Sequence, residues 1–228
     1  MRSESNEYWR DYFSDVASRG NTWLDYSNAK VQLQSLALCL ESAGEIAGKS
    51  CLDVGCGHGQ LSIMLKALES ASVVGSDFVS ALVEKNKRAV PGIDWRHGDV
   101  NDPGFVEELP EFDLIFMVEV LQYTDATAVV PCVWRRLKPG GRLIGMVPNR
   151  ECPIVARTNE RLQQRYHAVG PSELAALADG LEDLDFWGVR GLTFGDDQRI
   201  APYWVGGWST ATTFTRPPNR LNFVFAKA

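Results

Sequence analysis

The sequence is short of positive charge. Its 228 residues contain 23 lysines and arginines against 29 aspartates and glutamates, which gives a formal net charge of −6. A surface that binds nucleic acid needs clustered lysine and arginine to neutralise phosphates. The composition therefore argues against a nucleic-acid partner and otherwise fits an ordinary acidic protein.

Long apolar runs are also lacking. No stretch approaches the roughly 20 apolar residues that cross a bilayer as a helix. The first seven residues, MRSESNE, lack the apolar core of a signal peptide. We therefore expect a cytoplasmic protein without a membrane partner.

Cysteine and histidine are few and scattered. The cysteines are odd in number and form no Cys-x-x-Cys pair, which favours reduced thiols over a disulfide framework or a zinc site. No histidine–glutamate cluster or neighbouring pair of acids resembles a magnesium site, so no metal is expected. The five cysteines are Cys39, Cys51, Cys56, Cys132 and Cys152.

Glycine is concentrated in one stretch. Gly55, Gly57 and Gly59 alternate directly after the short apolar run 51–54, and an apolar, helix-compatible run follows them. Glycine admits positive φ angles and leaves no Cβ atom in the way of a ligand. The free N–H groups of a following helix would point back at that ligand. This order predicts a buried strand, a tight turn and a helix around a nucleotide-type pocket.

Strand and helix patterns alternate from residue 50 to residue 147. Short apolar runs bounded by turn residues predict the strands, and apolar residues at three- or four-residue spacing predict the helices. Repeated β-α units with apolar strands predict a parallel sheet covered by helices on both faces. The strands are expected at 50–54, 72–76, 93–97, 112–118 and 142–147, and the helices at 59–69, 79–90, 103–109 and 126–137.

The pattern differs on either side of this region. Helices at 5–18 and 24–42 precede it, and they either cap the pocket or only cover one face of the sheet. A partly helical insertion follows it, and then a helix and two strands separated by a loop rich in glycine, proline and aromatic residues. These later segments are expected at 149–170, 171–178, 184–192, 221–225 and, for the loop, 195–219.

We interpret the chain as one domain, since no internal repeat or low-complexity linker divides it. Residues 1–44 would form an N-terminal helical cap and residues 45–150 a cofactor-binding core. Residues 151–228 would supply substrate-side insertions and the closing strands.

Acidic residues mark the ends of successive predicted strands. Asp77, Asp99 and Glu119 end the second, third and fourth strands, and Asp53 lies just before the first glycine. In an open parallel sheet, ligands bind at the carboxyl ends of the strands. Carboxylates suit hydroxyl groups, amino groups and positive charge, and they repel phosphate. A single acid here would be an ordinary turn residue, but a series favours a ligand with hydroxyl and amino groups.

These motifs resemble those of the class I S-adenosylmethionine-dependent methyltransferases over about residues 45–150. The segment 53–59, DVGCGHG, is similar to the family's acid–x–Gly–x–Gly–x–Gly turn. The segments 73–77, 98–100, 112–123 and 137–142 resemble the later strand motifs and the turn before strand five. The resemblance implies a Rossmann-like α/β fold with seven strands in the order 3-2-1-4-5-7-6, the last one antiparallel.

The resemblance also implies a cofactor and its contacts. S-adenosylmethionine would bind, with S-adenosylhomocysteine as the product. The family's ribose acid corresponds to Asp77, and its adenine-side acid corresponds to Asp99. The implied cofactor-binding residues are Asp53, Gly55, Cys56, Gly57, Asp77, Phe78, Asp99, Val100 and Val118.

An NAD-dependent dehydrogenase is the competing interpretation of the glycine turn. Its fingerprint is Gly-x-Gly-x-x-Gly or Ala, whereas this chain has Gly59 at the fifth position and Gln60 at the sixth. Asp77 lies at a spacing that either family allows. The helical N-terminal segment and the turn at 138–141 favour the methyltransferase.

Three residues are candidates for catalysis. His167 lies in the insertion after strand five and is either a general base or a solvated loop side chain. Glu119 and Tyr123 follow strand four and should face the methyl-transfer region, although Glu119 could instead contact the cofactor amine. A base is needed only if the acceptor must lose a proton.

Aromatic residues are candidates for the acceptor pocket: Tyr12, Tyr166, Tyr203, Trp204 and Trp208. Those in the loop either bind a planar acceptor or pack against the edge strands. We predict an enzyme acting on a small metabolite, such as an intermediate of natural-product biosynthesis, as a monomer or homodimer. The alternative is a scaffold of the same fold that binds the cofactor without turnover.

Overall fold

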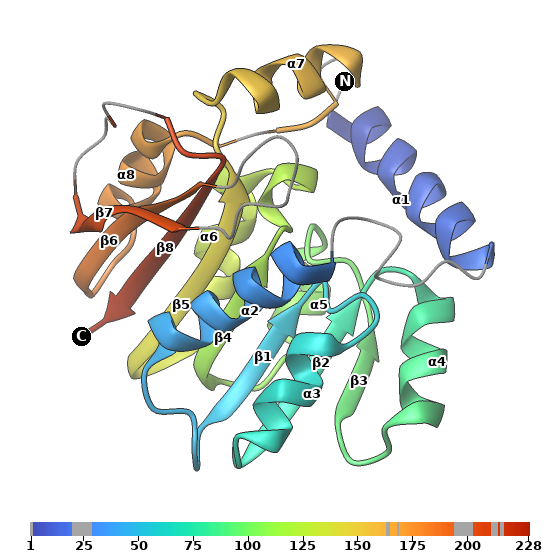
Figure 1. Ribbon diagram of the computed structural model, residues 1–228. Helices are drawn as coiled ribbons and strands as arrows, with labels where there is room; N and C mark the ends of the chain where they lie inside the picture. Colours follow the sequence, from blue (N-terminus) through green and yellow to red (C-terminus); the bar gives the residue numbers. More distant parts are fainter. Residues whose placement is uncertain are drawn as a thin grey trace.

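The computed structural model describes residues 2–19, 29–162, 165–167, 169–193, 203–210, 214 and 217–228. Its centre is one eight-stranded sheet in the order β3-β2-β1-β4-β5-β8-β6-β7 (Figure 1). The strands are β1 (Ser50–Val54), β2 (Ser72–Asp77), β3 (Asp94–His97), β4 (Phe112–Val118), β5 (Leu137–Pro148), β6 (Leu184–Thr193), β7 (Tyr203–Ser209) and β8 (Arg220–Lys227).

The first five strands run parallel, and β8 is antiparallel to both β5 and β6. If β8 is counted as the seventh predicted strand, the expected order 3-2-1-4-5-7-6 is confirmed. The additional strand β7 pairs antiparallel with β6 at the edge. The prediction of an unbroken loop over 195–219 was therefore wrong at residues 203–209, where backbone pairing with β6 outweighs a composition rich in glycine.

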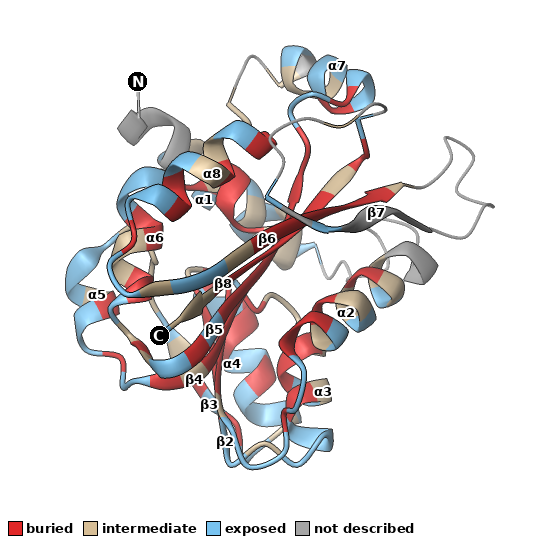
Figure 2. Ribbon diagram, turned by 90° about the vertical axis from the view of Figure 1, so that its left-hand side faces the viewer, coloured by how far each residue is buried: buried red, intermediate tan, exposed pale blue. Residues whose placement is uncertain are grey.

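Helices cover both faces of the sheet. Buried side chains of α2 (Ala29–Ala43), α3 (Gln60–Ala67) and α4 (Ser80–Ala89) pack on one face. Those of α5 (Pro103–Glu107), α6 (Ala126–Trp134) and α8 (Pro171–Asp179) pack on the other. Figure 2 shows that buried positions gather in the strands and on the helix sides that face them. Parallel strands that have helices packed on both faces of the sheet must be apolar on both faces, as the sequence pattern indicated.

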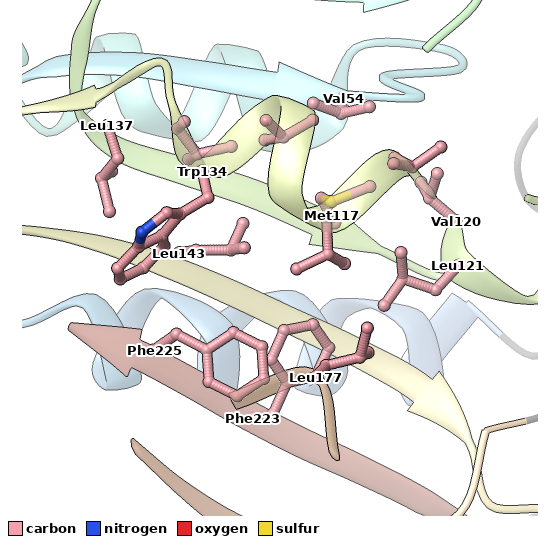
Figure 3. Packing of buried hydrophobic residues seen from close by; sticks show 14 of the residues in the cluster. Val54, Met117, Val120, Leu121, Trp134, Leu137, Leu143, Leu177, Phe223 and Phe225 are labelled. Atoms are coloured by element: carbon pink, nitrogen blue, oxygen red, sulfur yellow. The ribbon is translucent and has the colours of Figure 1, made fainter. Parts of the chain in front are cut away.

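Alternation along each strand divides the core between these two layers. In β4, Ile115 and Met117 face the α6 side, whereas Leu114 and Phe116 face the α3 side. Figure 3 shows the layer on the α6 side of the sheet, where Phe223 and Phe225 of β8 lie beside Leu177 of α8. The centroids of those two rings are 5.1 Å apart.

Two helices lie outside these layers. α1 (Arg2–Ser18) lies at the end of the sheet toward which β1–β3 point, and α7 (Pro153–Arg161) follows β5 at the same end (Figure 1). The helix predicted at 5–18 is thus present, and α7 is a helical part of the insertion expected at 149–170. None of the helices in the described part of the chain has the length and apolar character needed to span a bilayer.

Strand β5 begins earlier than predicted. Residues 138–141 were expected to form only a turn, but the strand starts at Leu137, which pairs with Phe112. Its register with β4 then shifts between Phe112 and Leu114, and Gly140 has a φ of 73°. A bulge of this kind absorbs the glycine pair without ending the strand.

Gly145 of β5 provides a test of core packing. A Cβ atom at this position would lie 2.1 Å from Cζ of Phe223, whose side chain is fully buried and cannot move aside. We expect Gly145→Ala to lower the free energy of unfolding by about 1–3 kcal/mol through overpacking. Urea unfolding measures this. Gly180→Ala is the matched control, because its nearest neighbour would be 3.6 Å away, and an equal loss in both variants would contradict the packing account.

Candidate functional site

A cavity of about 580 Å³ opens at the carboxyl ends of the parallel strands. Residues from the ends of β1, β2, β3 and β4, from the start of β8, and from α1, α2 and α7 line it. Cavities of this size are typical of small-molecule sites. All nine residues predicted to bind the cofactor line this one cavity.

The turn after β1 is shaped by three glycines with positive φ angles, 66° at Gly55, 52° at Gly57 and 82° at Gly59. A Cβ atom at Gly55 would lie 2.6 Å from Cγ2 of Val120, so β1 and the segment after β4 approach closely there. A Cβ atom at Gly57 would meet no atom within 4 Å. The backbone of Gly57 is therefore open toward the cavity, where a ligand can lie against it.

Asp77 joins this turn to the next strand. Its Oδ2 accepts the backbone N–H of Gly57 at 2.9 Å, and its Oδ1 accepts that of Val79 at 2.8 Å. Burial raises the pKa of Asp77, and the two backbone hydrogen bonds oppose that rise. A carboxylate oxygen has two lone pairs, so each oxygen can still accept a ligand hydroxyl.

Asp53 lies beneath the same turn and is 3% exposed. Its Oδ2 accepts the hydroxyl of Ser62 at 2.7 Å and the backbone N–H of Ser62 at 3.1 Å. Burial nevertheless raises the pKa of Asp53 to about 7. Its protonation state therefore changes near neutral pH.

Asp99 marks one end of the cavity, above β3. Its Oδ1 accepts the backbone N–H of Asn101 at 2.9 Å and the side-chain amide of Asn101 at 2.8 Å. Its Oδ2 accepts Nη2 of Arg10 at 2.6 Å. An arginine of α1 thus binds the acid that the family resemblance assigns to adenine.

Glu119 lies on the other side of the glycine turn, directly after β4. Its φ is 57°, which is uncommon for a residue other than glycine and typically marks functional sites. Its Oε1 accepts Nε of Arg220 at 2.5 Å, and its Oε2 accepts the side-chain amide of Gln122 at 3.1 Å. Glu119 is therefore an anchored carboxylate.

Aromatic rings of α1 and of the segments after β4 and α7 cover this part of the cavity. Trp9 lies edge to face with Tyr123 at 4.7 Å between ring centroids and with Tyr166 at 6.3 Å. Phe13 contacts Tyr123 at 5.1 Å and Phe78 at 6.1 Å. The indole N–H of Trp9 donates to the carbonyl oxygen of Arg165 at 2.8 Å, which holds α1 in place.

The predicted catalytic residues are divided between two hollows. Glu119 and Tyr123 line the main cavity, as do the predicted acceptor residues Tyr12 and Tyr166. His167 is exposed and lines a separate hollow of about 510 Å³ between α6 and α8. Its backbone N–H donates to the carbonyl of Gln122 at 2.8 Å, and the residue is absent from the lining of the main cavity. The structure gives no support for His167 as the catalytic base.

Trp208, a predicted acceptor residue on β7, does not line the cavity. Trp208 is 38% exposed at the sheet edge, and the guanidinium carbon of Arg190 lies 4.4 Å from its ring centroid. For Trp208, this contact agrees with the alternative that the aromatic residues pack against the edge strands. The side chains of Tyr203 and Trp204 lie outside the described residues.

Trp9, Arg10 and Arg220 are among the cavity residues that were not predicted from the sequence. Two features of the sequence could have indicated Trp9 and Arg10. They lie in a predicted helix that has an aromatic face, and that helix was a candidate cap over the pocket. No such feature indicated Arg220, because it contacts Glu119 across 101 positions of sequence through the pairing of β8 with β5.

Comparison with known proteins finds similarity over the segment that carries these motifs. Residues 51–141 match a family model described as a methyltransferase domain. A ubiquinone biosynthesis O-methyltransferase of Pseudomonas putida (strain GB-1) is 33% identical over 115 residues, which are 49% of each chain. A second one, from strain W619, is 36% identical over 109 residues, 46% of this chain and 47% of that protein. The chain thus spans about half the length of the curated relatives it matches.

Solved structures share the fold over nearly the whole chain. An S-adenosylmethionine-dependent methyltransferase from Thermotoga maritima, described as a possible histamine N-methyltransferase, has a TM-score of 0.72 at 16% identity, covering 95% of this chain and 98% of that one. The N-methyltransferase NodS from Bradyrhizobium japonicum, solved with S-adenosylhomocysteine, has a TM-score of 0.60 at 17% identity over 90% and 91% of the chains.

The raised pKa of Asp53 predicts a pH dependence of stability. The folded chain binds this proton below about pH 7, whereas an unfolded aspartate binds it only below about pH 4. The contribution therefore favours folding at low pH and is lost as the pH rises through 7. Relative to Asp53→Asn, the wild-type free energy of unfolding should fall between about pH 4 and 7, by at most about 4 kcal/mol. Urea unfolding at several pH values measures this, and equal slopes in both proteins would contradict it.

Proposed function

We propose that this chain, which matches a methyltransferase-domain model at residues 51–141 and shares the fold of solved S-adenosylmethionine-dependent methyltransferases, transfers a methyl group to a small-molecule acceptor. The observation that carries the proposal is the arrangement of one cavity. Asp53, Asp77, Asp99 and Glu119 line it together with the open glycine turn at Gly57.

The residues present fit S-adenosylmethionine chemically. Four carboxylates suit the hydroxyl groups, the amino groups and the positive charge of that cofactor, and they would repel the pyrophosphate of a dinucleotide. Asp77 would hold the ribose hydroxyls, and Gly57 and Asp53 would lie at the methionine part. Asp99, Phe78 and Val100 would hold the adenine. When bound, the cofactor supplies an electrophilic methyl group on a sulfonium, and the chain's contribution is to orient it.

The residues after β4 would hold the acceptor. Glu119 is the proposed proton acceptor for a hydroxyl or amine that must lose its proton. Burial and the nearby charge of Glu119 raise the pKa values of Tyr123 and Tyr166 above their usual range. These phenols therefore stay protonated, so they can donate hydrogen bonds but do not act as bases.

The acceptor is proposed to be a small biosynthetic intermediate. Aromatic rings line the cavity near Glu119, and two relatives of the chain are named as O-methyltransferases of ubiquinone biosynthesis. The net charge of −6 argues against a nucleic-acid acceptor. A scaffold that binds cofactor without turnover is the second candidate, and detection of a methylated product separates the two.

Calorimetric titration with S-adenosylhomocysteine, with NAD as the control ligand, tests the proposal. We expect binding of S-adenosylhomocysteine alone, and an affinity about ten to a hundred times lower in Asp77→Ala, because hydrogen bonds to a buried carboxylate are lost. Asp94→Ala is the matched control, since Asp94 lies at the opposite end of β3 and pairs with Arg96. Binding of NAD instead, or of neither ligand, would refute the proposal.

A further inference from the structure

The topology places a second charged pair at the far end of the cavity from Asp99. Across the sheet, the ends of β3, β2, β1 and β4 present Asp99, Asp77, Gly55 and Glu119 in that order. β8 is antiparallel, so its first residue, Arg220, lies at this same edge opposite Pro148. Arg220 therefore lies beyond the part of the cavity that the proposed function assigns to the cofactor.

Arg220 and Glu119 form a partly buried ion pair that faces this end of the cavity. Nε of Arg220 is 2.5 Å from Oε1 of Glu119, and the side chains are 25% and 34% exposed. Nη1 of Arg220 also donates to the carbonyl oxygen of Asn219 at 3.3 Å. Both residues line the cavity. The pair brings one charge of each sign, held in a fixed geometry, to the acceptor end.

The walls beside this pair are aromatic. Trp9, Tyr123 and Tyr166 contact one another edge to face, with centroids 4.7–6.3 Å apart. Burial and the nearby Glu119 carboxylate raise the pKa values of both phenols, which are therefore neutral. A planar ring fits such walls because aromatic pairs gain energy beyond their area of contact.

We propose that the Glu119–Arg220 pair selects an uncharged aromatic acceptor that presents a hydroxyl group to Glu119. This inference rests on the proposed function. A cationic amine would be attracted by Glu119 but repelled by Arg220. A carboxylate would be attracted by Arg220 but repelled by Glu119. A neutral hydroxyl donates a hydrogen bond to Glu119 while the charge of Arg220 remains balanced, so it avoids the cost of an uncompensated charge in a partly buried site.

Three small probes that share a ring test this selection: phenol, benzylamine and benzoate. Their relative affinities are measured by ligand-observed NMR on the protein saturated with S-adenosylhomocysteine. The wild type should bind phenol in preference to both charged probes. Glu119→Gln removes the negative charge that pairs with Arg220 and should shift selectivity about tenfold toward benzoate. Arg220→Met leaves Glu119 uncompensated and should shift it about tenfold toward benzylamine.

Opposite shifts of selectivity in the two variants distinguish recognition from a loss of structure. A loss of structure would weaken the binding of all three probes alike. Arg150→Met is the matched control, because Arg150 lines the separate hollow and pairs with Glu173, and its selectivity should equal that of the wild type. Preference of the wild type for a charged probe, failure to bind phenol, or unchanged ratios in both variants would overturn the inference. Failure of S-adenosylhomocysteine to bind would instead refute the proposed function.

Discussion

The hydrogen bonds to the Asp77 carboxylate determine the shape of the site. One oxygen holds the Gly57 N–H at the end of β1, and the other holds the Val79 N–H after β2. The side chain thus joins two neighbouring strand ends and fixes the glycine turn between them. The side-chain amide of Asn86 supports the opposite side of the turn by donating to the Gly57 carbonyl at 2.8 Å. These hydrogen bonds hold the glycine turn in place, so Gly57 needs no side chain of its own to keep the turn open to the cavity.

The N-terminal helix connects the two ends of the cavity. Arg10 binds Asp99 above β3, whereas Trp9, the preceding residue, contacts Tyr123 and Tyr166 near Glu119. α1 therefore covers both the proposed cofactor end and the proposed acceptor end. Residues of α1 and α2 line the cavity, and buried side chains of α2 also cover a face of the sheet.

Local patterns made most of the core predictable from the sequence. The glycine turn, the apolar strands and the acids at their ends are encoded within a few residues of one another, and parallel strands bring such ends to one edge. Contacts between distant segments were not predictable. Trp9 reaches Arg165 and Arg220 reaches Glu119 only after α1 and β8 have taken their places. The side that each loop residue faces was not predictable either, since Tyr166 lines the main cavity and its neighbour His167 lines another hollow.

A crystal structure of the protein with S-adenosylhomocysteine tests the central claim most directly. The account predicts ribose hydroxyls within hydrogen-bonding distance of the Asp77 carboxylate, the amino-acid part against Gly57, and unfilled space between the ligand sulfur and the Glu119–Arg220 pair. A ligand seated in the hollow beside His167, or one that lies across Glu119 and leaves Asp77 without contact, would contradict it.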